Sequence, residues 1–198
     1  AMADRLAADI FHGVAGTAIR AGILLHCLHD ASREQAIAAA AAQRRTGALL
    51  LLRTEGGEPD AAVAHMADAG VTPERIMVVA SARRSGEQAL RAVLARGAGV
   101  AMVDLLADGW EAAARHAAVV VSLADSGFGD RIVLGSGLTR RARPRASGGG
   151  PGWSGMVERF PLLLMEAGLG AVAVRALLVD NPRRALTIEP PAGNEGTA

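Results

Sequence analysis

The chain alternates short apolar runs with longer, alanine-rich stretches in which apolar positions repeat at helical spacing. Each apolar run has the length of a β-strand, and glycine stands close to the ends of several of them. The runs predict strands over residues 21–28, 47–53, 75–80, 99–104 and 131–135. The other stretches predict helices over residues 32–46, 60–69, 86–96, 110–126, 156–167 and 172–179. A strand followed by a helix is therefore expected five times in succession.

The expected strands are apolar throughout, which is typical of a parallel sheet that helices cover on both faces. No glycine-rich dinucleotide fingerprint follows the first strand, which disfavours a Rossmann fold. We therefore expect an α/β fold of the TIM type, a partial (β/α) barrel with about five parallel strands and flanking helices. A full barrel needs about 250 residues, whereas this chain has 198. We expect one truncated barrel domain over residues 1–188 and a flexible tail over residues 189–198.

The composition, 51% hydrophobic and 21% charged residues, is that of a globular protein. Every basic residue is an arginine, so Schiff-base and P-loop lysine chemistry are excluded. The single cysteine excludes an internal disulfide framework and a thiolate zinc cluster. A net charge of +1 argues against a nucleic-acid partner. Because the chain shows neither a membrane-length apolar run nor a signal-peptide core, we expect a cytoplasmic protein with no membrane partner.

Six segments resemble, in the same order, segments of one known protein family. Residues 16–25 (GTAIRAGILL) resemble GTGIRAGIIK, and residues 127–141 (GFGDRIVLGSGLTRR) resemble GYEDRILLSHDICTK. Residues 179–186 (VDNPRRAL) match VENPRRLL almost position for position. The other three segments lie at residues 46–55, 69–84 and 96–104. The chain thus resembles the phosphotriesterase-like hydrolases of the amidohydrolase superfamily over most of its length.

The resemblance implies a (β/α)8 barrel that hydrolyses phosphotriesters, lactones and related esters at two bridged metal ions. It places the family's bridging lysine at Leu25, two of its histidines at Arg53 and Ala80, and its metal-binding aspartate at Gly137. None of these four residues offers a metal ligand. The resemblance also aligns the chain with barrel strands four to eight, so the family's opening His-x-His pair has no counterpart. We therefore expect no metal and no cofactor.

The end of the first expected strand is one candidate site, because barrel enzymes act at the carboxyl ends of their strands. Two histidines, one cysteine and one aspartate stand there in the segment HCLHD. The functional interpretation is catalysis by Cys27 as a nucleophile or by His29 as an acid or base that Asp30 orients. In this interpretation His26 contacts the substrate. One alternative is a new metal site built from these four residues. The other is a polar loop beside a buried, inert Cys27.

The ends of later strands supply further candidates. Arg53 and Glu55 share a face of the second strand and are expected to bind substrate, where Arg53 suits a carboxylate or phosphate. Asp104 matches an aspartate that the family often keeps, and is expected to act as a general base. The alternative is an ion pair of Arg53 with Glu55 or with Asp104. Ser81 and Ser136 lie near replaced ligand positions, but no histidine has a triad spacing, which disfavours a serine nucleophile.

An arginine- and glycine-rich stretch, residues 139–153, follows the fifth expected strand. In the resemblance it corresponds to the long loop that shapes the family's substrate pocket. The functional interpretation is a mobile lid in which Arg140 and Arg141 attract an anionic substrate and Trp153 adds an apolar contact. The alternative is a solvated loop without a role in binding.

Three functions follow from these residues. The first is a metal-independent enzyme that acts on a small polar, lactone-like or ester-like metabolite by acid–base catalysis, in cyclisation, isomerisation or hydrolysis, for example in secondary metabolism. The second is a catalytically dead pseudoenzyme that serves as a binding or scaffold module. The third is a residual metal-dependent hydrolase. Since a half-barrel exposes strand edges and an apolar face, we also expect a homodimer, or a partner chain that covers the open half.

Overall fold

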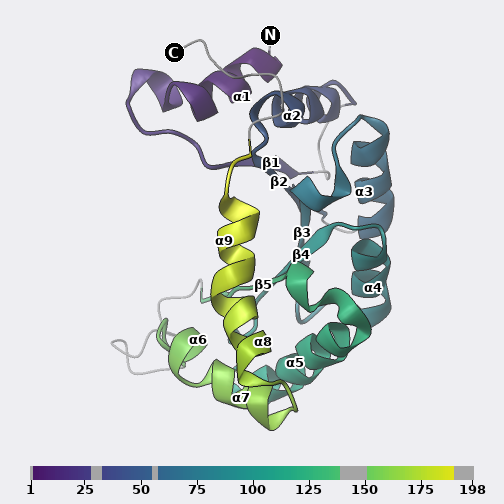
Figure 1. Cartoon of the computed structure of the whole chain (residues 1–198), viewed down its shortest axis with the longest axis vertical. Coiled ribbons are helices and arrows are strands. Elements are labelled where there is room, and N and C mark those ends of the chain that lie inside the picture. The colour runs from purple at the N-terminus through teal and green to yellow at the C-terminus, as the bar shows by residue number, and fades with distance from the viewer. Residues whose placement is uncertain (1, 28–32, 55–57, 139–150, 190–198) are drawn as a thin grey trace. The chain divides into compact units, whose positions relative to one another are not determined.

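A computed structural model of the chain describes residues 2–27, 33–54, 58–138 and 151–189 (Figure 1). The strands are β1(Ile23–Cys27), β2(Leu49–Arg53), β3(Ile76–Ser81), β4(Gly99–Val103) and β5(Ile132–Leu134). They form one sheet in the order β1-β2-β3-β4-β5, in which β1 pairs in parallel with β2 and β4 with β5. The predicted parallel α/β architecture is confirmed. The described residues divide into two compact units, residues 2–78, 95–99 and 183–189 in the first and residues 79–94 and 100–182 in the second.

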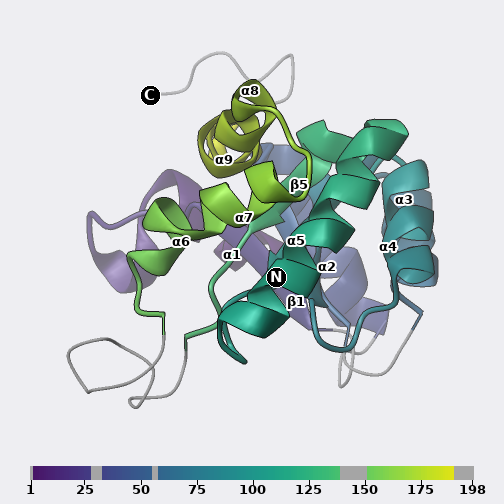
Figure 2. The ribbon, with the colours of Figure 1, turned by 90° about the horizontal axis from the view of Figure 1, so that it is seen from below.

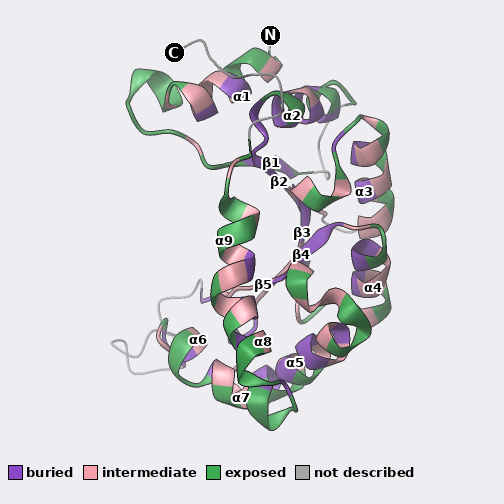
Figure 3. Cartoon of the chain, in the orientation of Figure 1, coloured by how far each residue is buried: buried purple, intermediate pink, exposed green. Residues whose placement is uncertain are grey.

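The first unit is built around the pairing of β1 with β2. Its helical elements are α1(Met2–Phe11), η1(Val14–Gly16), α2(Arg33–Thr46), α3(Pro59–Asp68) and η2(Pro73–Arg75). The α2 helix contacts α1 and both strands, and most of its buried residues are alanines, whose small side chains allow close packing (Figure 3). The register pairs Leu25 with Leu51 and Cys27 with Arg53, so the last residues of β1 and β2 are direct neighbours.

The second unit packs its helices around β4 and β5. From α4 onward, the helical elements of the chain are α4(Glu87–Ala95), α5(Trp110–Leu123), η3(Ala124–Phe128), η4(Gly129–Arg131), α6(Gly155–Glu158), α7(Phe160–Glu166), α8(Ala171–Arg175), η6(Ala176–Asp180) and α9(Asn181–Leu186). The α7 helix lies alongside α5 and buries Phe160 and Leu164 (Figure 2). At the start of α9, the buried Asn181 amide donates hydrogen bonds to the carbonyls of Gly129 (2.7 Å) and Ile132 (2.8 Å).

The elements expected from the sequence are present, but several differ from the expectation. The expected helix over residues 172–179 is α8 followed by η6, and α9 was not predicted. The α1 helix was not predicted, although Ala7 and Ile10 give it a buried side. The expected helix over residues 110–126 leaves regular geometry after Leu123, and Gly127 has a left-handed φ of 86°. The expected helix over residues 156–167 is two helices, α6 and α7, because the backbone bends at Arg159 and Pro161 begins a new helix.

Among the described helices, none is both long enough and apolar enough to cross a membrane. Of the expected tail, residues 190–198 lie outside the described residues. The single domain expected over residues 1–188 stays a prediction.

Candidate functional site

The end of β1 places Cys27 and His26 on opposite faces of the sheet. Exposed and buried residues alternate along the strand, so Cys27 is exposed while His26 is 6% exposed. Cys27 is a free cysteine, and its direct neighbour on β2 is the exposed Arg53. The structure thus brings Cys27 and Arg53 together and separates both from His26. The predicted contact of His26 with substrate stays a prediction.

His26 instead lies inside the first unit. Within the described part of the chain, its Nε2 atom is buried and has no hydrogen-bond partner. Burial lowers the pKa of His26 below its ordinary value, and the nearby His65 lowers it further. Burial therefore favours the neutral form of His26 in the folded state.

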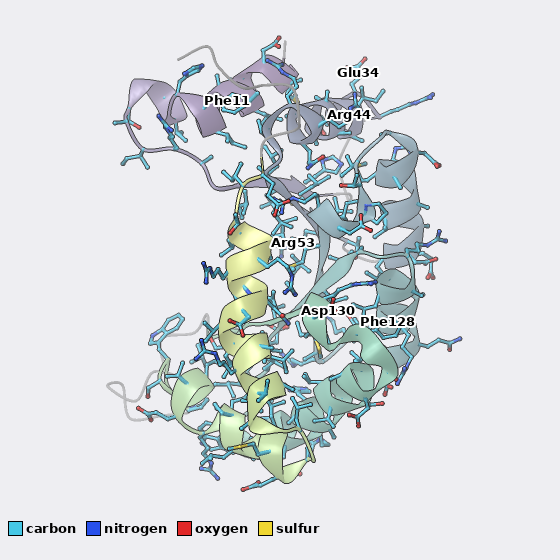
Figure 4. The ribbon with its side chains drawn as sticks, in the orientation of Figure 1. Phe11, Glu34, Arg44, Arg53, Phe128 and Asp130 are labelled. Carbon is cyan, nitrogen blue, oxygen red and sulfur yellow. The ribbon has the colours of Figure 1, made fainter. Side chains whose placement is uncertain are left out.

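Arg53 stands at the carboxyl end of β2 (Figure 4). Its predicted role as an anchor for an anionic substrate stays a prediction, as does the alternative ion pair. The neighbouring candidates His29, Asp30 and Glu55 lie outside the described residues, and so do Arg140 and Arg141.

A second polar group lies at the carboxyl ends of β3 and β4, inside the second unit. The hydroxyl of Ser81, the last residue of β3, donates a hydrogen bond of 2.7 Å to Oδ2 of Asp104. Ser81 is buried, whereas Asp104, which directly follows β4, is partly exposed. Asp104 has a left-handed φ of 67°, which is uncommon for a residue with a side chain. The sequence signal for Ser81 was its place near a replaced ligand position, but its bond to Asp104 was missed.

The loop after β5 passes directly against Asp104. Gly137 has a φ of 67°, and a Cβ atom placed on it would overlap the Cα of Asp104 and lie 2.7 Å from its backbone nitrogen. Backbone hydrogen bonds fix this approach, from Leu105 N to Gly135 O (3.2 Å) and from Leu106 N to Ser136 O (3.1 Å). The loops after β4 and β5 are therefore joined beyond the ends of their strands.

Trp153 is 66% exposed, so its predicted apolar contact with substrate stays a prediction. A second tryptophan, Trp110, was not singled out from the sequence. The guanidinium of Arg159 lies 4.5 Å from its ring centre. Trp110 also closes over Gly155, where a Cβ atom would come within 2.9 Å of the indole. These contacts hold α6 and α5 together, which is a structural role.

The residues at the family's metal positions do not fit a binuclear centre. Leu25 and Ala80 are aliphatic, Arg53 carries a positive charge, and Gly137 has neither a side chain nor room for one. Across the described ranges, no group of three or more His, Cys, Asp or Glu residues is placed to hold a metal ion. The donors that a bridged metal pair requires are therefore not supplied at these positions.

Solved structures with this architecture define the class of protein. The phosphotriesterase homology protein from Escherichia coli, solved with phosphate in its active site, is 23% identical, with a TM-score of 0.81 over 93% of this chain and 66% of its own. The phosphotriesterase from Mycobacterium tuberculosis is 23% identical, with a TM-score of 0.78 over 95% and 62%. A mutant organophosphorus hydrolase from Deinococcus radiodurans is 26% identical, with a TM-score of 0.74 over 91% and 60%. The chain thus has a partial barrel fold.

The chain spans about 60–66% of the length of these structures. No curated protein matches it. The sequence profile of the phosphotriesterase family matches residues 1–186, nearly the whole chain. The chain therefore belongs to the phosphotriesterase family, as the ordered segments predicted.

Proposed function

We propose that this chain is a metal-independent enzyme that acts on a small polar, lactone-like or ester-like metabolite by acid–base catalysis, with Asp104 as the proton acceptor. The observation that carries the proposal is the hydrogen bond from Ser81 to Asp104 at the carboxyl ends of β3 and β4. Because Oδ2 of Asp104 accepts this bond, Oδ1 is the oxygen that takes the proton from the substrate and later returns it.

The backbone of Asp104 supports a functional role. A left-handed conformation at a residue with a side chain is disfavoured by about 1–3 kcal/mol, and persists where the surrounding structure holds it in place. Such residues gather at active sites, and in barrel folds the site lies at the carboxyl ends of the strands. Membership of a family of hydrolases supports the same conclusion.

The exposed Arg53 is proposed to hold an anionic group of the substrate, because a guanidinium forms two parallel hydrogen bonds with a carboxylate or phosphate. Cys27, its neighbour on β1, is the second proposed catalytic group. His29, Glu55 and the two loop arginines keep their predicted roles in this proposal.

The test is turnover of three probes, paraoxon, a p-nitrophenyl ester and a γ-lactone, by the wild-type chain and by Asp104→Asn. The asparagine keeps the shape of the side chain and still accepts the Ser81 bond, but it cannot take a proton. We expect kcat/KM to fall about 100-fold or more. Asp125→Asn is the matched control, because Asp125 is exposed and far from the site in sequence. The turnover rate of the wild-type chain is expected to be the same with and without EDTA.

Two outcomes would overturn the proposal. Equal turnover by the wild type and Asp104→Asn would remove Asp104 from the site. Loss of turnover in EDTA, restored by zinc, would favour a metal-dependent hydrolase instead. Binding of a probe without any turnover would favour the pseudoenzyme.

A further inference from the structure

The space at the end of β5 where the family's metal-binding aspartate would stand is filled by Asp104. A Cβ atom on Gly137 would overlap the Asp104 Cα and lie 2.8 Å from its Oδ1. The carboxylate of Asp104 therefore reaches the point from which a side chain at position 137 would project. No residue other than glycine fits at position 137 without moving the backbone of Asp104.

We propose that Asp104 serves as the reactive carboxylate at this end of the sheet in place of the aspartate missing at position 137, whose space it fills, and that Ser81 is its positioning residue. This inference rests on the proposed function for the role of the carboxylate. It extends that function by giving each of two further residues a role: Gly137 leaves the space that Asp104 fills, and Ser81 positions the Asp104 carboxylate.

The surroundings of Asp104 are fixed from both sides. On the β5 side, Gly135 N donates to Met102 O (2.8 Å), and Leu105 N donates back to Gly135 O. On the β3 side, Ala82 N donates to Val103 O (3.1 Å), next to the Ser81 hydroxyl bond. The Ser81 hydroxyl thus holds the Asp104 carboxylate, and the backbone hydrogen bonds hold the adjoining main chain. Such a carboxylate is preorganised to accept a proton.

The first test compares two glycines on the same loop by thermal unfolding. Gly137→Ala would meet the Asp104 backbone at a left-handed position, whereas Gly135→Ala would meet neighbours only at ordinary contact distances of 3.6 Å and more. We expect Gly137→Ala to lower Tm by about 5–10 °C or to prevent folding. Gly135→Ala is expected to change Tm by about 2 °C or less. Equal Tm values for the two variants would overturn the inference.

The second test asks whether the family's carboxylate can be restored. Gly137→Asp is expected to be at least as destabilised as Gly137→Ala and to bind no more zinc than the wild type, measured by metal content after dialysis against zinc chloride. Stoichiometric zinc in Gly137→Asp would contradict the inference, because it would show that position 137 still has room for a ligand.

The third test concerns Ser81. On whichever probe the wild type turns over, Ser81→Ala is expected to lower kcat about 10-fold with little change in KM, and Ser81→Thr to recover most of the loss. If Ser81 had only a structural role, Ser81→Ala would lower Tm without lowering kcat at a constant KM. If the wild type turns over no probe, the proposed function fails, while the glycine pair still decides whether Asp104 fills position 137.

Discussion

At the scale of the residue, the alternation of β1 decides what its polar side chains can do. Cys27 faces the open side of the strand beside Arg53, whereas His26 points into the unit and its ring is removed from water. A protonated imidazole at that position would lose its hydration and would face the charge of His65. Neutral His26 therefore belongs to the packing of the first unit.

His26 is expected to make the protein less stable in acid. Because the folded-state pKa of His26 is lowered, the unfolded chain binds the proton more readily. Its contribution is fully present above about pH 6.5, the ordinary pKa of histidine, and is lost as the pH falls below that value. Urea unfolding between pH 7.5 and 5 should show this decline, and His26→Leu should flatten it. The exposed His12 is the control, since His12→Gln is expected to keep the decline; an unchanged slope in His26→Leu would refute the assignment.

At the scale of the element, the closing motif VDNPRRAL has a structural explanation. Asn181 begins α9, and its amide donates two hydrogen bonds to backbone carbonyls around the start of β5. The Asn181 side chain is 2% exposed and Ile132 is fully buried, so the Ile132 carbonyl has no water molecule as a substitute donor, whereas Gly129 is only partly buried. The asparagine of the motif therefore fixes the helix start to the last strand, whatever reaction the chain performs.

Asn181→Ala is expected to lower the free energy of unfolding by about 2 kcal/mol, because it removes the Asn181 donor from the buried Ile132 carbonyl and from the partly buried Gly129 carbonyl. Chemical denaturation monitored by circular dichroism measures this loss. Val179→Ala, which alters a 49% exposed side chain in the same segment, should change stability by less than about 0.5 kcal/mol. Similar losses in both variants would mean that the two hydrogen bonds contribute little.

At the scale of the whole molecule, the exposed apolar face of β1 is a candidate surface for binding another chain. In the described sheet β1 is an end strand, and Ile23 and Leu25 are 38% and 58% exposed. Strands of parallel sheets are normally buried on both faces, and exposed edges invite pairing with another chain. We propose that a second copy of the chain, or another polypeptide, covers this face.

Light scattering coupled to size-exclusion chromatography tests this proposal. We expect the wild-type chain to elute as a dimer and Leu25→Arg to elute as a monomer, because a charge on the apolar face opposes its burial. Val172→Arg is the control, since Val172 is 85% exposed on α8, away from this face in sequence. A wild-type chain that is monomeric at every concentration, with no copurifying polypeptide, would argue against the covered face.

Much of the fold was predictable from local pattern. Apolar runs bounded by glycines gave the strands, and the spacing between them gave the helices α2 to α5, because period and length are properties of neighbouring residues. The break between α6 and α7 also has a local signal, because Pro161 stands in the first turn of α7, but the helix expected over residues 156–167 ran through it. Of the candidate site, Asp104 was found by its match to an aspartate that the family often keeps at a strand end, while its partner Ser81 was disfavoured as a nucleophile because no histidine has a triad spacing.

The sequence by itself determined the order of the strands and of most helices, and the family; its resemblance to that family implied that Leu25, Arg53, Ala80 and Gly137 stand where ligands would. These are facts of residue identity and periodicity. Only the tertiary structure decided that Ser81 donates to Asp104 and that the Asp104 backbone fills the space beside Gly137. The reason is physical: both depend on backbone torsions at strand ends and on contacts between residues distant along the chain, which no local pattern encodes.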